Sequence, residues 1–257
     1  MHSFPRSETQ RLALLIDAEN ASPRIIEPLL NEAAKFGTVN VRRIYGDWTR
    51  PDLATWKERL NKFAIQPIQQ FRYTTGKNCS DSALIIDAMD LLHSAKFDGF
   101  CIVSSDSDFT RLACRLREAG VSVYGFGENK TPEPFVRACD RFIFVENLSS
   151  GDHDAADLPK AMGQSARTPI PGKVAALGPE QRKLIHAAYN ALAPEGGYVT
   201  LAQLGSQVVK LSPSFDSRTY GYTKLSELVS AIDDFEIDNR IGDKKSGLKH
   251  PYVRLKS

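Results

Sequence analysis

Short apolar runs alternate with amphipathic segments over residues 9–148, and this alternation is the strongest constraint on how the chain can fold. Six apolar runs predict buried strands: Arg11–Ile16, Val39–Tyr45, Ile65–Phe71, Phe100–Val103, Val121–Phe126 and Arg141–Val145. Segments with helical spacing lie between them and begin at Pro23, Pro51, Ser80, Phe109 and Pro134. This alternation favours a parallel sheet with helices on both faces, which binds ligands beyond the carboxyl ends of its strands.

The periodicity stops over residues 149–177. This stretch mixes Gly, Pro, Ser and Ala with scattered charges, which predicts a flexible linker between two domains. Residues 178–256 then follow the order of a small winged helix-turn-helix domain. Three helices and a hairpin are expected there: Pro179–Leu192, Leu201–Lys210, Lys224–Ile232, and the strands Phe235–Ile241 and Pro251–Leu255.

Composition narrows the class of protein. The formal net charge of +2 argues against a strongly basic coat protein. The four cysteines form no CxxC pair and the histidines lie far from them in sequence, so neither a zinc site nor a disulfide framework is expected. The first residues lack the apolar stretch of a signal peptide, and the apolar runs are shorter than the ~20 residues of a membrane span. We therefore expect a cytoplasmic protein without a membrane partner.

Acidic residues stand directly after the first and fourth expected strands. Asp17 follows the first strand, and Asp106 and Asp108 follow the fourth within the run SSDSDF. Asp81 lies in the first turn of the helix that leads into the fourth strand, and Asn20 comes three residues after Asp17. If the first and fourth strands are neighbours, these side chains converge on one rim of the sheet.

Four carboxylates in one pocket would repel one another by about 3–4 kcal/mol per pair at ~4–5 Å and an effective dielectric constant near 20. Such a cluster must take up protons or bind cations, and its hard oxygen atoms suit Mg²⁺ or Mn²⁺. Ions of this kind activate water and stabilise both oxygens of a phosphoryl displacement. The alternative is that each acid only caps a helix, and Asp81 and Asp108 are obvious candidates for that role.

Aromatic and basic residues interleave around the second and third expected strands. Tyr45, Arg72 and Tyr73 stand near strand ends, where rings can stack on bases and cations can neutralise the phosphates of single-stranded RNA. Trp56 and Phe71 are expected in the core instead.

Other kinds of site are disfavoured by the motifs. The Gly-Lys of GKNCSD does not belong to the GxxxxGK[ST] pattern of a P-loop, and no GxGxxG follows the first strand. Ser104 and Ser105 lack a GxSxG elbow, which argues against acyl transfer by serine. The run DSD at residues 106–108 would suit a sugar-nucleotide transferase, but no acceptor-domain pattern accompanies it.

Four segments, LALLIDAEN, GKNCSDSALIIDAMDLL, CIVSSDSDF and GVSVYGFG, occur in that order over about residues 10–148. In order and spacing they resemble the motifs of the NYN domain, a branch of PIN-like nucleases. The resemblance implies a PIN-like sheet whose acids hold Mg²⁺ or Mn²⁺ and catalyse RNA cleavage. Carried over motif by motif, these acids are Asp17, Asp81, Asp106 and Asp108.

The same resemblance bears on three further residues. Asn20 matches a polar position beside the first acid, and Lys77 matches a basic position that implies contact with phosphate. Asp87 also matches the pattern but lies deeper in its helix. This suggests that it either holds the site residues in place without contacting the metal or takes part in helix packing.

A basic segment and a second resemblance mark the C-terminal part. Residues 240–256 hold six basic side chains against one acid, a local excess that can meet phosphates. The runs GGYVTLAQLGSQVV and PSFDSRTYGYTKLSELV are similar to the OST-HTH domain, also called LOTUS. This resemblance implies binding of RNA or docking to an RNA-handling protein.

Within this domain, Arg218, Tyr220 and Lys224 lead into the third helix, which is the recognition position of a winged helix. Lys244 and Lys245 are expected on the wing. The alternative is that Arg218 and Tyr220 only brace the turn before the helix.

These features together predict a metal-dependent ribonuclease, acting as an endonuclease on single-stranded RNA and assisted by its C-terminal domain. The alternative is an RNA-binding adaptor whose acidic site no longer cuts. Turnover of RNA in the presence of a divalent ion separates the two.

Overall fold

The computed structural model describes residues 9–71, 79–148, 177–193, 197–241 and 249–256. The chain divides into two compact units, Met1–Gly151 and Asp152–Ser257. The hydrophobic cores of the two units share no residues.

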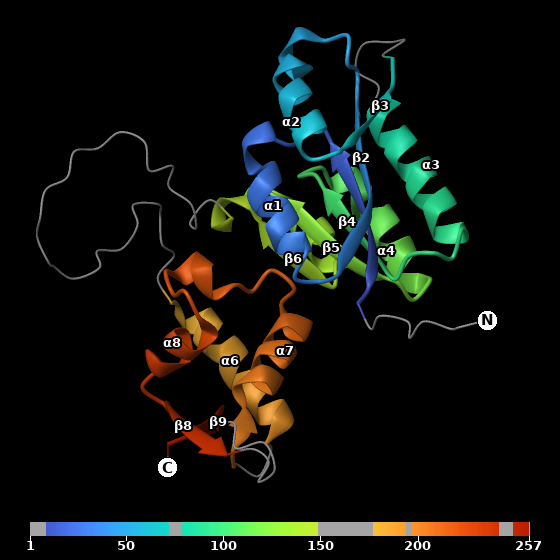
Figure 1. Cartoon of the computed structure of the whole chain (residues 1–257). Helices are drawn as coiled ribbons and strands as arrows, with labels where there is room; N and C mark the ends of the chain where they lie inside the picture. Colours follow the sequence, from blue (N-terminus) through green and yellow to red (C-terminus); the bar gives the residue numbers. More distant parts are fainter. Residues whose placement is uncertain (1–8, 72–78, 149–176, 194–196, 242–248, 257) are drawn as a thin grey trace, which may run out of the picture. The chain divides into compact units, whose positions relative to one another are not determined.

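The first unit contains a six-stranded sheet in which every pair of neighbouring strands is parallel (Figure 1). Its strands are β1 Arg11–Asp17, β2 Thr38–Gly46, β3 Gln66–Gln69, β4 Gly99–Val103, β5 Ser122–Gly127 and β6 Arg141–Phe144. The strand order is β3-β2-β1-β4-β5-β6, so the order reverses between β1 and β4. Ligands of such sheets bind at this reversal, beyond the carboxyl ends of the two strands.

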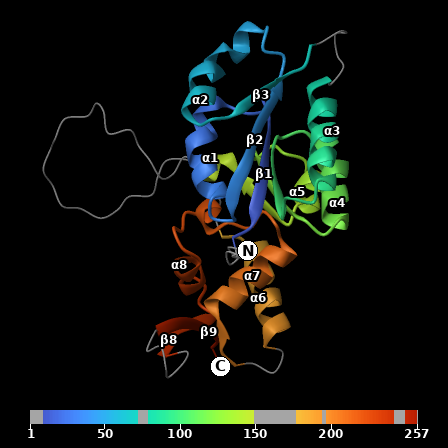
Figure 2. The same cartoon turned by 45° about the vertical axis from the view of Figure 1, so that its right-hand side comes forward.

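Helices cover both faces of the sheet, as predicted from the alternating pattern (Figure 2). One face packs against α1 (Ile26–Ala33), the 3-10 helix η2 (Pro51–Trp56) and α2 (Lys57–Lys62). The other face packs against α3 (Cys79–His93), α4 (Thr110–Glu118) and α5 (Glu133–Ala138). β1 lies between two cores because its side chains alternate: Ala13 and Leu15 belong to one core, and Leu12, Leu14 and Ile16 to the other.

The third strand is shorter than expected. β3 is an edge strand that pairs only with β2, and its last residue, Gln69, faces Gly46, where β2 ends. Gln70 N still donates a 3.1 Å hydrogen bond to the carbonyl oxygen of Gly46, but β2 ends at that residue. Phe71 is 51% exposed, so the expectation that it lies in the core is wrong, whereas Trp56 is 1% exposed, as predicted.

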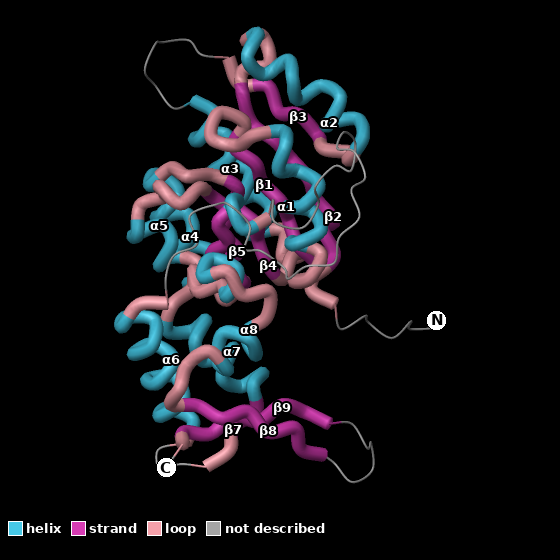
Figure 3. The backbone as a smooth tube through the Cα atoms, turned by 90° about the vertical axis from the view of Figure 1, so that its left-hand side faces the viewer, coloured by secondary structure: helices cyan, strands magenta, loops and turns pink. Residues whose placement is uncertain are grey.

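Over its described residues, the second unit combines three α-helices and a short 3-10 helix with a three-stranded antiparallel sheet (Figure 3). Its elements are α6 Pro179–Leu192, β7 Val199–Thr200, α7 Leu201–Leu211, the 3-10 helix η5 Ser217–Tyr220, α8 Leu225–Ser230, β8 Phe235–Ile241 and β9 Lys249–Leu255. The predicted hairpin is the pair β8 and β9. The short strand β7 was not predicted, because it exists through pairing of Val199 with Val253 and of Thr200 with Tyr252, which lie far away in sequence.

A polar contact ties α3 to the sheet. On β2, Arg43 Nη1 donates a hydrogen bond of 2.5 Å to Asp87 Oδ1, and the Tyr45 hydroxyl donates to Asp87 Oδ2. Burial raises the pKa of Tyr45, and the Asp87 carboxylate raises it further. Tyr45 therefore stays a neutral hydrogen-bond donor, and Asp87 acts as a packing partner between α3 and β2.

Replacement of Asp87 by Ala is expected to lower the free energy of unfolding by about 2–4 kcal/mol, because the partly buried Arg43 loses its carboxylate. Urea unfolding followed by tryptophan fluorescence measures this directly, since Trp48 and Trp56 both lie in the first unit. Asp90→Ala, an exposed position on the same helix, is the matched control and should change stability by less than about 0.5 kcal/mol. Equal effects of the two changes would contradict this view of Asp87.

Candidate active site

The acids predicted from the sequence lie at or next to the carboxyl ends of β1 and β4. Asp17 is the last residue of β1 and is 1% exposed. Asp106 caps the 3-10 helix η3 (Ser107–Phe109) after β4, and Asp108 lies inside that turn. Asp81 stands in the first turn of α3 and is 8% exposed. The capping role expected for Asp108 thus belongs to Asp106, whose Oδ1 accepts a 2.9 Å hydrogen bond from Asp108 N.

Three of these acids are close enough to share a cation. Asp81, Asp106 and Asp108 each offer a carboxylate oxygen, and the three atoms lie within 4.8 Å of one another. Opposite ligands of Mg²⁺ are about 4.2 Å apart, since each ligand lies ~2.1 Å from the ion. Small side-chain movements would therefore bring all three oxygens to binding distance.

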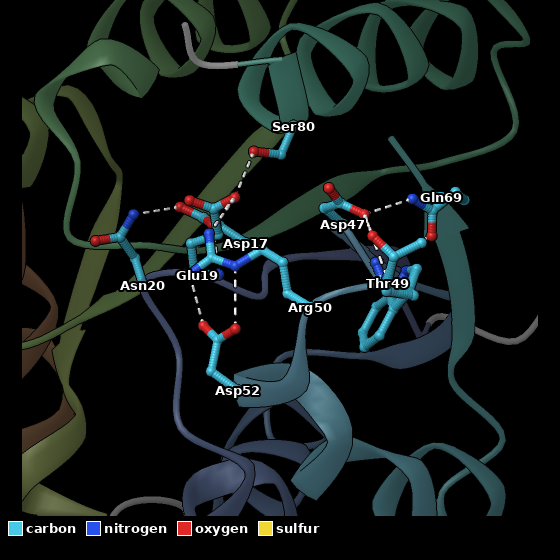
Figure 4. A network of polar contacts seen from close by, with 10 residues as sticks. Asp17, Glu19, Asn20, Asp47, Thr49, Arg50, Asp52, Gln69 and Ser80 are labelled. Carbon is cyan, nitrogen blue, oxygen red and sulfur yellow. Dashed lines mark hydrogen bonds and ion pairs between the residues drawn. The ribbon is translucent and has the colours of Figure 1, made fainter. Parts of the chain in front are cut away.

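The charge of Asp17 acts on Asp81 of this group, and the Asp17 carboxylate is held by hydrogen bonds, of which Figure 4 shows the one from Asn20. Its Oδ2 accepts from Asn20 Nδ2 at 2.7 Å and from Ser104 Oγ at 2.9 Å, and its Oδ1 accepts from Glu19 N at 3.0 Å. Ser104 Oγ in turn accepts a 3.0 Å hydrogen bond from Asp106 N. Ser104 therefore links the acid at the end of β1 to the loop that carries the acids after β4.

The negative charges in this group affect one another. The pKa of Asp81 is raised from 3.8 to about 7, first by burial and then by the charges of Asp17, Asp106, Glu19 and Asp108. Burial also raises the pKa of Asp17, against the effect of its hydrogen bonds from Asn20 and Ser104. Without a cation, the site thus favours uptake of a proton near neutral pH.

Glu19 and two serines belong to the surroundings of the site although sequence reasoning did not single them out for it. Glu19 Oε1 accepts a 3.4 Å hydrogen bond from Ser80 Oγ and lies 3.8 Å from Arg50 Nη1. Ser105 Oγ accepts a 2.9 Å hydrogen bond from Glu128 N, which joins the loops after β4 and β5. The only signal was position, since Glu19, Ser80 and Ser105 lie beside the predicted acids in DAEN, CSDS and SSDSD respectively.

The residues of the first unit that the sequence predicts to contact RNA lie in different surroundings. Tyr45 is 1% exposed and its hydroxyl binds Asp87, so the expectation that it contacts RNA is wrong. Asn20 lies at the site, with its side chain directed at Asp17. Arg72, Tyr73 and Lys77 lie outside the described residues.

In the second unit, the turn before α8 is held by its own side chains. Arg218 Nη2 lies 2.5 Å from Asp216 Oδ2, and the rings of Tyr220 and Phe215 pack with their centroids 5.9 Å apart. Both predicted contact residues therefore brace the turn, whatever else they bind. Lys224 is exposed at the start of α8. Lys244 and Lys245 lie outside the described residues.

A parallel sheet with acids gathered at the ends of its two central strands is the arrangement of PIN-like nucleases. The family model of the NYN domain, a branch of this class, matches residues 11–147, and the chain belongs to the NYN domain family. The model of the OST-HTH/LOTUS domain matches residues 179–246. Both domains suggested by the sequence motifs are thereby confirmed.

Solved structures give further similarities. A protein of unknown function from Vibrio parahaemolyticus is 17% identical, with a TM-score of 0.46, over 54% of this chain and 94% of that chain. An uncharacterized protein from Nitrosomonas europaea is 31% identical over 41% of this chain and 93% of that chain, with a TM-score of 0.26. A protein from Chromobacterium violaceum is 28% identical over 34% of this chain and 87% of that chain, with a TM-score of 0.25.

No curated protein matches the sequence. Among the described helices, none combines the length and the apolar character that crossing a membrane requires.

Asp81→Asn is expected to stabilise the metal-free protein at pH 8. The folded-state pKa of about 7 lies above the unfolded value of 3.8, so the folded protein binds more protons between these values. The stability contributed by protonated Asp81 is therefore lost as the pH rises through about 7, and a neutral Asn escapes this loss. We expect the unfolding temperature in EDTA to rise by roughly 3 °C or more at pH 8, with little gain at pH 5.

The control for this change is Asp98→Asn, at an exposed carboxylate that pairs with Arg11 at the amino ends of β1 and β4. It should give no stabilisation at either pH. A destabilised Asp81→Asn protein at pH 8 would show that the acids of the cluster do not repel one another as inferred.

Proposed function

We propose that this protein is a metal-dependent ribonuclease that acts as an endonuclease on single-stranded RNA in the cytoplasm. Its catalytic residues would be Asp17, Asp81, Asp106 and Asp108. The proposal depends on one observation, the approach of the carboxylate oxygens of Asp81, Asp106 and Asp108 to within 4.8 Å in a chain of the NYN family.

The donor set fits Mg²⁺ or Mn²⁺. Every candidate ligand is a hard carboxylate oxygen. The pKa of Asp81 is raised first by burial and then by the negative charge of its neighbours, and a cation would neutralise that charge. Asp81, Asp106 and Asp108 would hold the ion, and Asp17 would complete the set. When bound, such an ion lowers the pKa of water and stabilises the charge that develops on a phosphate.

The protein's own side chains would position this chemistry. Asn20 and Ser104 fix the Asp17 carboxylate, and Ser104 also fixes the backbone of Asp106. The acids are thereby set before the substrate arrives, which lowers the reorganisation that the reaction requires. Arg72 and Lys77 are proposed as further contacts to the RNA near this site.

The C-terminal unit is proposed to hold the RNA or an RNA-handling protein. Exposed Lys224 at the start of α8 supports this, together with the basic excess of residues 240–256. The proposed contact residues of this unit are Arg218, Tyr220, Lys224, Lys244 and Lys245.

The second candidate function is an RNA-binding adaptor without catalysis. It is favoured by the state of Asp17, whose two carboxylate oxygens accept three hydrogen bonds from the protein and are therefore less available to a metal ion. In that case the acid group would have no catalytic role and would only help to hold the structure of the loops.

The purified full chain is expected to cleave a fluorescent single-stranded RNA with Mn²⁺ and to lose this activity in EDTA. Asp81→Asn and Asp106→Asn each remove a ligand and should lower the rate at least about 100-fold, equivalent to about 2.7 kcal/mol of transition-state stabilisation. Asp98→Asn, which alters an acid at the amino ends of the strands, on the side of the sheet away from the site, should retain the activity. Cleavage that survives both site changes would indicate a contaminant, and RNA binding without cleavage would favour the adaptor.

A second prediction concerns RNA affinity. Changing Lys244 and Lys245 together to Gln should weaken binding of single-stranded RNA about 5–10-fold at 100 mM salt and reduce the salt dependence of log K by about 1.4. Fluorescence anisotropy of the full chain in EDTA measures both quantities. Lys183 and Lys210, exposed lysines on α6 and α7, provide the matched double change to Gln. Equal losses in the two double variants would argue against a specific contact at the wing.

A further inference from the structure

The loop after β2 is held firmly beside the acids (Figure 4). Asp47 Oδ1 accepts hydrogen bonds from Thr49 N at 3.2 Å, Thr49 Oγ1 at 2.6 Å and Gln69 Nε2 at 2.9 Å. Trp48 Nε1 donates to the carbonyl oxygen of Ile68 at 3.0 Å, and Arg50 N donates to the carbonyl oxygen of Asp47 at 3.1 Å. These contacts fix the backbone from which the Arg50 side chain departs.

The guanidinium of Arg50 is itself held in place and lies next to Glu19, whose charge acts on Asp81 of the acid group. Its Nε and Nη2 donate to the two carboxylate oxygens of Asp52 at 3.0 and 2.7 Å, and its Nη1 lies 3.8 Å from Glu19 Oε1. Glu19 also accepts a hydrogen bond from Ser80, the residue before Asp81. A single carboxylate thus stands between the Arg50 cation and the acid group, while 34% of the Arg50 side chain remains exposed.

The position of Arg50 suits the electrostatics of the proposed reaction, in which more than one phosphate must be neutralised. An RNA strand that reaches the acids brings several phosphates, and a cation bound by the acids neutralises the phosphate that is cleaved more than the neighbouring ones. A guanidinium presents a planar fork of donors that matches phosphate. Because Asp52 already holds Arg50, less side-chain entropy is lost when a phosphate binds.

Building on the proposed function, we propose that Arg50 binds the phosphate next to the one that is cleaved. The RNA strand then passes over the carboxyl ends of the strands, from the acids after β4 and β1 toward the loop after β2. Asp52 and Glu19 orient the guanidinium, and its exposed face meets the phosphate.

The test compares Arg50→Gln with Arg11→Gln in the full chain. Arg11 is a matched control because it forms a similar two-bond pair with Asp98, at the opposite edge of the sheet. In cleavage assays with Mn²⁺, Arg50→Gln should lower kcat/KM about 10-fold or more, chiefly through a higher KM, and Arg50→Lys should recover part of this loss. Arg11→Gln should leave both constants unchanged.

A binding measurement separates this proposal from the nuclease proposal. In an Asp106→Asn background, which is not expected to cleave, Arg50→Gln should weaken binding of a short single-stranded RNA about 10-fold and lower the salt dependence of log K by about 0.7. Arg50→Lys should restore the salt dependence. If the parent binds RNA but never cleaves it, the nuclease proposal fails and this comparison still decides the role of Arg50.

Three results would overturn the assignment of Arg50. Affinity and salt dependence that match the parent would show that Arg50 does not contact RNA. Equal losses in Arg50→Gln and Arg11→Gln would indicate a general charge effect. A fall of the unfolding temperature that accounts for the loss of binding, without recovery in Arg50→Lys, would show that Arg50 only braces its loop.

Discussion

The parallel pairing of β1 with β4 is the constraint on which the site depends. This pairing aligns Ile16 with Val103, so that Asp17 and the loop of Asp106 begin at the same level of the sheet. Residues almost ninety positions apart in sequence thereby become neighbours, and the Ser104 hydroxyl spans the remaining gap between them. Without this register the acids would face different surroundings, and their charges would neither repel one another nor attract a common cation.

The acid group lowers the stability of the metal-free fold. Burial and mutual repulsion raise the pKa of Asp81 to about 7, so the charged site is disfavoured when it is empty. The surrounding structure opposes this through hydrogen bonds to Asp17 and through apolar cores on both faces of the sheet. A divalent ion would relieve the repulsion, so the same charges that weaken the metal-free fold would provide affinity for such an ion.

Sequence patterns located the strands and the acids because both depend on local order. Asp17 and Asp106 stand where apolar runs end, and the alternation of strands with helices leaves few sheet topologies. The partners of Tyr45 and Arg50 could not be inferred in this way. Tyr45 is buried in the core that α3 covers, with its hydroxyl donating to Asp87, and Arg50 lies beside Glu19 on a loop that a hydrogen bond from Gln69 helps to hold. Such contacts arise from tertiary packing and leave no periodic trace in the sequence.

The central position of β1 also has a consequence for how the chain is made. β1 is synthesised first, yet its neighbour β4 leaves the ribosome only after α3 has been completed. Pairings between distant segments form slowly, because a long loop must close before any contact compensates for its lost entropy. A nascent chain that ends before β4 therefore leaves one side of β1 without a paired strand. It contains Asp17 and Asp81 but lacks Asp106 and Asp108. The order of synthesis thus delays assembly of the acid group until the central pair of strands can join.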